Sequence, residues 1–188
     1  DAQAMPDPLF RESDLDGQEK LKEVDFQSPV RRPEEFQAKK KIAAYYAMIE
    51  QIDGHVGRLL DCLERTGQRE NTLVIFMSDH GEMLGDHGLI SKGCRFYEGL
   101  VHVPLIVSWP GVVAEARQVE ALVELTDIAP TLLDYAGVEI PDRMSGRSLR
   151  AVLEGGEDKH RESVRCEYYS ALSLLAPGRE AWNGSYGT

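Results

Sequence analysis

The stretch TLVIFMSDHGEMLGDHGLISK, residues 72–92, decides how the chain folds and where its chemistry lies. Its first six residues are nearly all apolar, which predicts a buried strand of a parallel sheet over 72–77. Open α/β sheets hold their ligands in loops that follow the carboxyl ends of such strands. Asp79 and His80 fall there, and a carboxylate next to an imidazole commonly begins a divalent metal site. Lys92, twelve residues after His80, adds a charge suited to an anionic substrate.

The segments around this stretch alternate between helical and strand patterns. Apolar residues recur at helical spacing from Ile42 to Leu63, so a helix is expected to end near Thr66 and Gly67. Further strands are expected at residues 103–108, 123–125 and 164–169, and further helices at 126–137 and 148–153. This order predicts an α/β fold, with a mostly parallel sheet flanked by helices.

Composition limits the kind of partner. The formal net charge is -11 and the sequence shows no basic patch, which argues against nucleic acid as a partner. No apolar run has the length of a membrane span. The three cysteines stand at unrelated spacings and give neither a disulfide framework nor a zinc motif.

The pattern SDHGExLGDHGLxxKG, followed by FYE and VPLIV, resembles the sulfatase family of the alkaline-phosphatase-like superfamily. Three other segments resemble sulfatase sequences: the helix that begins with Tyr45-Tyr46, the helix over 125–137, and the turn Met144–Leu149. The resemblance covers about residues 40–155 and implies an alkaline-phosphatase-like fold that is incomplete here.

The resemblance also assigns roles within the loop. It implies that Asp79 and His80 are metal ligands and that Lys92 is a catalytic lysine that contacts the sulfate. Arg95 is a further candidate for binding an anionic substrate. Calcium is the expected metal because hard cations prefer carboxylate oxygen, while the imidazole of His80 leaves zinc and manganese open.

One part of the family's pattern is missing. Sulfatases carry a Cys or Ser followed by x-Pro-x-Arg, and its oxidation gives the formylglycine nucleophile. None of the cysteines has Pro and Arg at those positions. We therefore expect the C-terminal part of a sulfatase, whose partners are a sulfate ester and the missing N-terminal half. Residues 1–35 would be an extended or disordered lead-in, 36–155 the C-terminal half of the catalytic domain, and 156–188 the start of a truncated subdomain.

Two alternatives stay open at the level of sequence. Phosphonate monoester hydrolases and phosphodiesterases of the superfamily share a DHGE loop with a downstream Lys, and phosphoethanolamine transferases share DHGE with zinc. The chain could also be a non-catalytic binding fragment that preserves the loop. The segments over 45–60, 125–137 and 144–149 favour the sulfatase interpretation.

Overall fold

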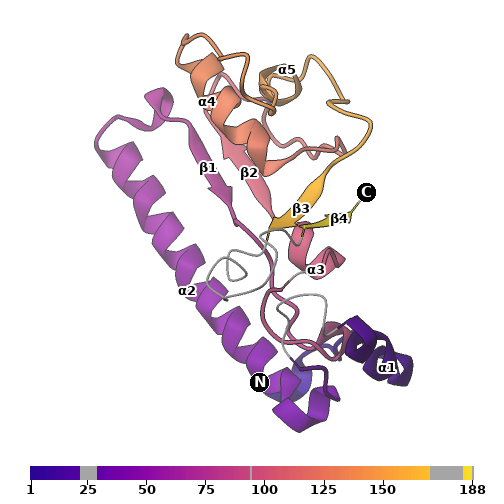
Figure 1. Cartoon of the computed structure of the whole chain (residues 1–188). Helices are drawn as coiled ribbons and strands as arrows, with labels where there is room; N and C mark the ends of the chain where they lie inside the picture. Colours follow the sequence, from indigo (N-terminus) through magenta and orange to yellow (C-terminus); the bar gives the residue numbers. More distant parts are fainter. Residues whose placement is uncertain (22–28, 94, 170–183, 188) are drawn as a thin grey trace, which may run out of the picture. The chain divides into compact units, whose positions relative to one another are not determined.

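The structure is a computed structural model that describes residues 1–21, 29–93, 95–169 and 184–187 (Figure 1). The chain divides into two compact units, which are described separately. The first comprises Asp1–Asp61, His80–Val103 and Glu167–Gly187, and the second comprises Cys62–Asp79 and Pro104–Cys166. A search of the described helices finds none with the length and apolar character needed to cross a membrane.

The first unit is mainly helical. Its elements are η1 (Ala2–Ala4), α1 (Glu12–Leu21), η2 (Pro33–Phe36), most of α2 (Ala38–Arg65), η4 (Asp86–Gly88), α3 (Glu98–Val101) and β4 (Gly184–Gly187). Its small core consists of Met83, Leu89 and Leu100, against which Val30 and Tyr97 pack. Most of this core therefore comes from the loop that follows Asp79.

The prediction of an extended or disordered lead-in over residues 1–35 is wrong for α1. Glu12 and Asp14 place negative charge in the first turn of this helix, where the helix dipole favours it. Arg32 binds both carboxylate oxygens of Glu12, at 3.1 and 2.8 Å, and lowers the pKa of that carboxyl. Gln18 is buried against residues almost eighty positions later. Contacts this distant cannot be read from local sequence.

Helix α2 confirms the predicted periodicity. The left-handed residue Gln37, with φ 55°, separates the short turn that begins at Pro33 from α2 itself. The helix runs to Arg65, and Gly67 follows in the left-handed conformation with φ 67°, as expected of a glycine that ends a helix. Figure 1 shows α2 as one long, uninterrupted helix.

The second unit contains the strand that was expected to be parallel. β1 (Val74–Met77) pairs with β2 (Leu105–Ser108) in antiparallel register, with Val74 opposite Ser108 and Met77 opposite Leu105. The prediction of a mostly parallel sheet is therefore wrong for this pair. β1 is also only half-buried, and Met77 is exposed. An apolar run indicates a strand but does not fix the direction of its neighbour.

The remaining elements of the second unit are η3 (Arg69–Asn71), η5 (Leu125–Asp127), α4 (Ile128–Tyr135) and α5 (Arg150–Leu153). The strand predicted over 123–125 is wrong. The amide of Glu124 donates to Oδ2 of Asp127 at 2.8 Å, and the chain turns into η5. β3 (Cys166–Tyr169), most of which belongs to the first unit, confirms the last predicted strand and pairs with β4. Helices and two-stranded sheets together make a partial α/β fold.

Candidate active-site loop

Residues 80–101 of the first unit form a loop whose two arms hydrogen-bond to each other. The amide of Gly81 donates to the carbonyl of Leu100 at 2.8 Å, and the amide of Glu82 donates to that of Gly99 at 3.1 Å. A Cβ at position 81 would lie 1.9 Å from the carbonyl oxygen of Gly99, so only glycine fits. The start of the loop, next to His80, is thereby fixed against α3.

His80 and Lys92 meet within this loop. Nδ1 of His80 lies 2.7 Å from the carbonyl oxygen of Gly81, which can only accept, so Nδ1 carries the proton of the neutral ring. Nε2 then presents a lone pair, and Lys92 Nζ lies 3.0 Å from it. The structure thus brings together two of the residues that the sequence singled out. Asp79 precedes His80 directly and is exposed.

The middle of the loop is held by the N-terminal segment. The amide of Leu9 donates to Oδ1 of Asp86 at 2.7 Å, and the amide of His87 donates to the carbonyl of Leu9 at 2.6 Å. His87 has a left-handed backbone, with φ 54°. Asp86 and His87 thus shape the loop through hydrogen bonds to Leu9.

Two glycines allow this close approach. Gly85 has φ 112°, and a Cβ there would lie 2.8 Å from Cγ of Pro8. Gly88 has φ 71°, and a Cβ there would lie 2.6 Å from the carbonyl oxygen of Arg31. Both positions need glycine for conformation and for space. The repeated Gly in the loop sequence therefore serves the packing of Pro8 and Arg31 against it.

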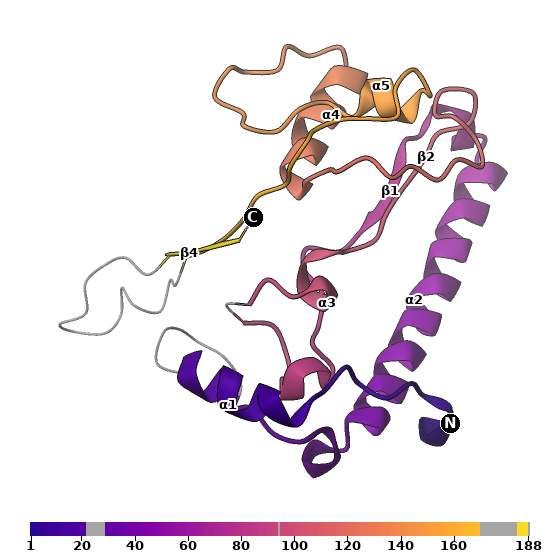
Figure 2. The ribbon, with the colours of Figure 1, turned by 90° about the vertical axis from the view of Figure 1, so that its right-hand side faces the viewer.

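Arg95 is anchored by a residue that sequence reasoning missed. Its Nε donates to Oε1 of Gln18 on α1 at 3.3 Å, and Nε2 of the same amide donates to the hydroxyl of Tyr97. Figures 1 and 2 both show α1 beside the loop. The only local signal was the spacing of Asp14 and Gln18, which places both on one face of a helix.

A short helix closes the end of the loop. Glu98 begins α3. His102 lies just after α3, and its Nδ1 is 2.5 Å from Oε1 of Glu98, one helical turn away. The helical turn places this side chain beside Glu98 and not in a sheet.

A sulfatase family model matches residues 9–138, more than half of the chain and all of this loop. The chain belongs to the sulfatase family. It is 39% identical over 133 residues to an arylsulfatase of Clostridium perfringens, covering 69% of this chain and 27% of the relative. It is 38% identical over 126 residues to an N-acetylglucosamine-6-O-sulfatase of Bacteroides thetaiotaomicron, covering 66% of this chain and 22% of the relative. The chain thus spans about a quarter of these relatives.

Solved structures place this sulfatase chain in the alkaline-phosphatase-like fold. A structure described as bound to its substrate D-glucosamine-2-N,6-O-disulfate matches with a TM-score of 0.63 and 33% identity, over 79% of this chain and 29% of the other. The phosphonate monoester hydrolase from Silicibacter pomeroyi matches with a TM-score of 0.73 and 30% identity, over 90% of this chain and 35% of the other. The predicted superfamily is therefore confirmed.

Sulfatases are generally dependent on a divalent metal. The carboxylate of Asp79 is a suitable donor for one. Nε2 of the adjacent His80 would be a second donor once Lys92 Nζ, 3.0 Å away, no longer occupies its lone pair. Across the described part of the chain, no group of three or more His, Cys, Asp and Glu side chains could hold an ion. Asp79 and His80 could therefore supply some of the ligands of a divalent metal, but not a complete set.

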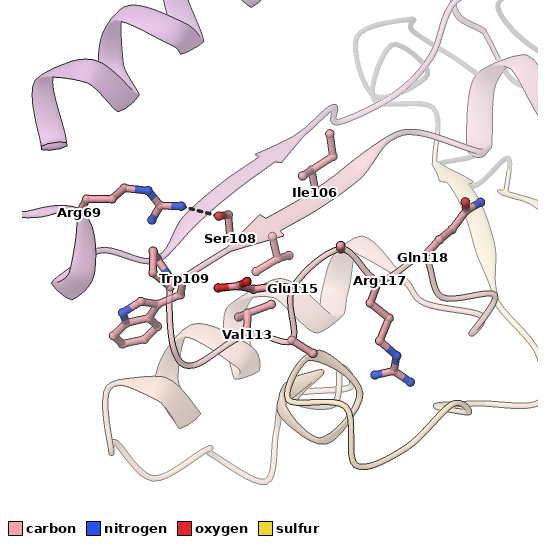
Figure 3. A pocket seen from close by; sticks show the side chains of 12 residues that line it. Arg69, Ile106, Ser108, Trp109, Val113, Glu115, Arg117 and Gln118 are labelled. Carbon is pink, nitrogen blue, oxygen red and sulfur yellow. Dashed lines mark hydrogen bonds between the residues drawn. The ribbon is translucent and has the colours of Figure 1, made fainter.

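The second unit has a separate pocket of about 590 Å³ (Figure 3). It is lined by Arg69, the end of β2 and the turn that follows it, and Arg69 donates to the hydroxyl of Ser108. This is the Val74–Ser108 end of the two-stranded sheet, whereas Asp79 follows the Met77 end. The pocket therefore lies away from the strand end that leads into the sulfatase loop.

Proposed function

We propose that this chain carries the metal- and sulfate-binding loop of a sulfuric ester hydrolase. The observation that carries the proposal is the 3.0 Å contact between His80 and Lys92 in a loop whose sequence matches the sulfatase family. In this proposal Asp79 and His80 hold the metal, Lys92 contacts the sulfuryl group, and Arg95 adds a second cationic contact.

The chemistry of sulfate ester hydrolysis explains these residue types. Negative charge must be stabilised on the sulfuryl oxygens and on the leaving alkoxide, and a bound divalent cation supplies Lewis acidity there. Lys92 contributes a compact ammonium beside the ring of His80, where it stabilises oxyanion charge. The hydrogen bond to the carbonyl of Gly81 keeps the His80 ring in one orientation. Calcium suits Asp79, and zinc or manganese suits His80 better.

The nucleophile of the proposed reaction comes from outside the 188 residues. None of Cys62, Cys94 and Cys166 lies in a Cys-x-Pro-x-Arg sequence. A formylglycine in the N-terminal half of the same catalytic domain would complete the site, and residues 36–155 would supply the C-terminal half. This is consistent with the chain covering 27% and 22% of two sulfatase relatives.

A second candidate reaction is phosphonate monoester hydrolysis. The phosphonate monoester hydrolase from Silicibacter pomeroyi covers 90% of this chain at 30% identity. The same loop chemistry would serve a phosphorus oxyanion. The sulfatase reaction is preferred because the curated relatives with 39% and 38% identity are named as sulfatases. Comparing 4-nitrophenyl sulfate with a phenylphosphonate monoester as substrates of the full-length protein would decide between them.

The roles of the loop residues are tested by substitution in the full-length protein. Asp79→Ala should lower the rate on an aryl sulfate by about a thousandfold or more, because it removes a hard ligand.

Lys92→Ala should lower kcat more than it raises KM while bound metal, measured by elemental analysis, stays unchanged. Lys92→Arg should rescue poorly, because a planar guanidinium does not replace a compact ammonium. Wild-type kcat in Lys92→Ala would exclude the proposed role of the lysine.

A further inference from the structure

We propose that Gln18 is a positioning residue: it holds Arg95, in the same loop as Lys92, as a cationic contact for the sulfate oxyanion. The substrate class in this inference rests on the proposed function. The inference gives a residue of helix α1 a role in substrate binding. Gln18 lies outside the loop motif and does not itself touch the substrate. It acts through Arg95, three residues after Lys92.

The amide of Gln18 is placed between two loop side chains. Gln18 is only 6% exposed, although Ser13, Asp16 and Gly17 of the same helix are exposed. A guanidinium can only donate, so Oε1 of the amide must face Nε of Arg95, at 3.3 Å. The amide nitrogen then faces the hydroxyl of Tyr97, as the structure shows. The amide therefore has one orientation that satisfies both partners.

A second contact of the same helix face fixes the geometry. Asp14 lies four residues before Gln18, and its Oδ1 is 3.6 Å from Nδ1 of His87. The His87 ring stacks on Tyr97 with centroids 3.9 Å apart and an interplanar angle of 16°. Tyr97 is thus held by Gln18 at its hydroxyl and by His87 at its face. Helix α1 thus contacts the loop at two points: Gln18 contacts Arg95 and Tyr97, and Asp14 contacts His87.

The net charge of the chain explains why a fixed cation would matter for binding an anion. The chain has a net charge of -11, so its overall field repels a sulfate ester. Local cations must provide the attraction, and a guanidinium with a fixed plane suits the geometry of oxyanions. A long side chain loses conformational freedom when it binds an anion, and an arginine already held at Nε loses less. Gln18 would therefore raise affinity for the anion more than it changes the chemical step.

The test measures binding of inorganic sulfate to the 188-residue chain by NMR, following the Nε–H signal of Arg95. This signal, assigned by its loss in Arg95→Lys, should shift and saturate with sulfate. Gln18→Met keeps the volume and removes both hydrogen bonds, and it should weaken sulfate affinity by about tenfold. Ser13→Ala, at an exposed position of α1, is the matched control and should leave the affinity unchanged.

Arg95→Lys keeps the positive charge and the intact Gln18 but lacks the Nε–H group, so it should weaken binding to a similar extent. Because this variant gives no Nε–H signal, the affinities of all the variants are compared by isothermal titration calorimetry with sulfate. If Gln18 acts through Arg95, Gln18→Met added to Arg95→Lys should weaken binding no further. An Arg95 signal that ignores sulfate, wild-type affinity in Gln18→Met, or additive effects in the double variant would each overturn the inference.

Kinetics on the full-length protein separate this inference from the proposed reaction. Gln18→Met should raise KM for 4-nitrophenyl sulfate by about tenfold with kcat nearly unchanged, as for loss of uniform binding. A purely structural role would displace Lys92 and lower kcat instead, which would overturn the inference. Sulfate binding through Gln18 and Arg95 in a protein that hydrolyses no sulfate ester would overturn the reaction and still support the inference.

Discussion

At the scale of single residues, Asp127 is the most constrained carboxylate among those described. Its side chain is fully buried and accepts the amides of Glu124 and Arg147, both at 2.8 Å. It also pairs with Arg161, and Nε2 of His160 lies 3.2 Å away without hydrogen-bond geometry. The sequence predicted only a helix over 126–137 here, because partners that are 20 or more residues later leave no local pattern.

Asp127→Ala should destabilise the chain by about 3 kcal/mol or more. It removes one of the two carboxylates that contact Arg161, the other being that of Glu124, and it leaves the amides of Glu124 and Arg147 without their acceptor. Urea denaturation followed by circular dichroism measures the change. Asp158→Ala is the matched control: Asp158 pairs with Arg117, but its side chain is 90% exposed. Its loss should cost less than about 1 kcal/mol. Equal losses in both variants would show that the Asp127 contacts add no stability.

Two cysteines should differ in reactivity. Burial raises the pKa of the Cys166 thiol, and the nearby negative charge of Glu124 raises it further. Less thiolate is then present at pH 8, and Cys62 is exposed on α2. Iodoacetamide should therefore modify Cys62 faster than Cys166, as followed by mass spectrometry of the peptides. In urea the two rates should converge; equal rates in the folded chain would contradict the burial argument.

At the scale of elements, the spacing of apolar residues predicts whether a segment is a helix or a strand better than it predicts what packs against that segment. The pattern from Ile42 to Leu63 correctly predicted α2 and its end. Its apolar face, however, is buried only near the start: Ile42 is 6% exposed, whereas Ile52 is 48% and Leu59 is 66% exposed. A Cβ at Gly54 or Gly57 would meet nothing within 4 Å. The direction of β2 and the packing of α1 were also unpredictable, since both depend on contacts between distant residues.

The uneven burial of α2 gives a direct test. Ile42→Ala should destabilise the chain by about 2–4 kcal/mol, because it opens a cavity at a buried position. Ile52→Ala should change the free energy of unfolding by less than about 1 kcal/mol, because the side chain is already half in water. Both substitutions remove the same atoms from the same helix, so each controls the other. If both variants lost the same free energy of unfolding in chemical denaturation, the apolar face of α2 would be buried along its whole length.

At the scale of the whole molecule, the loop over residues 80–101 has a clear sequence pattern, but the chain matches only part of the length of its sulfatase relatives. The sequence pattern identified Asp79, His80 and Lys92, and the structure brings His80 and Lys92 to 3.0 Å. It did not identify Gln18 or residues 8–10, which hold the loop from outside the motif. The chain covers 27% and 22% of two sulfatase relatives, so most of a relative's length has no counterpart here.

The 188-residue chain alone should therefore show no sulfatase turnover. Its cysteines lack the nucleophile motif, and its described residues offer no group of three or more candidate metal ligands. Binding without a nucleophile and a complete metal site leaves the barrier to ester cleavage nearly unchanged. Release of 4-nitrophenol from its sulfate ester, with calcium, manganese or zinc added, should equal that of Lys92→Ala at the same concentration. Metal-dependent multiple turnover that disappears in Lys92→Ala would show that the chain holds a complete active site.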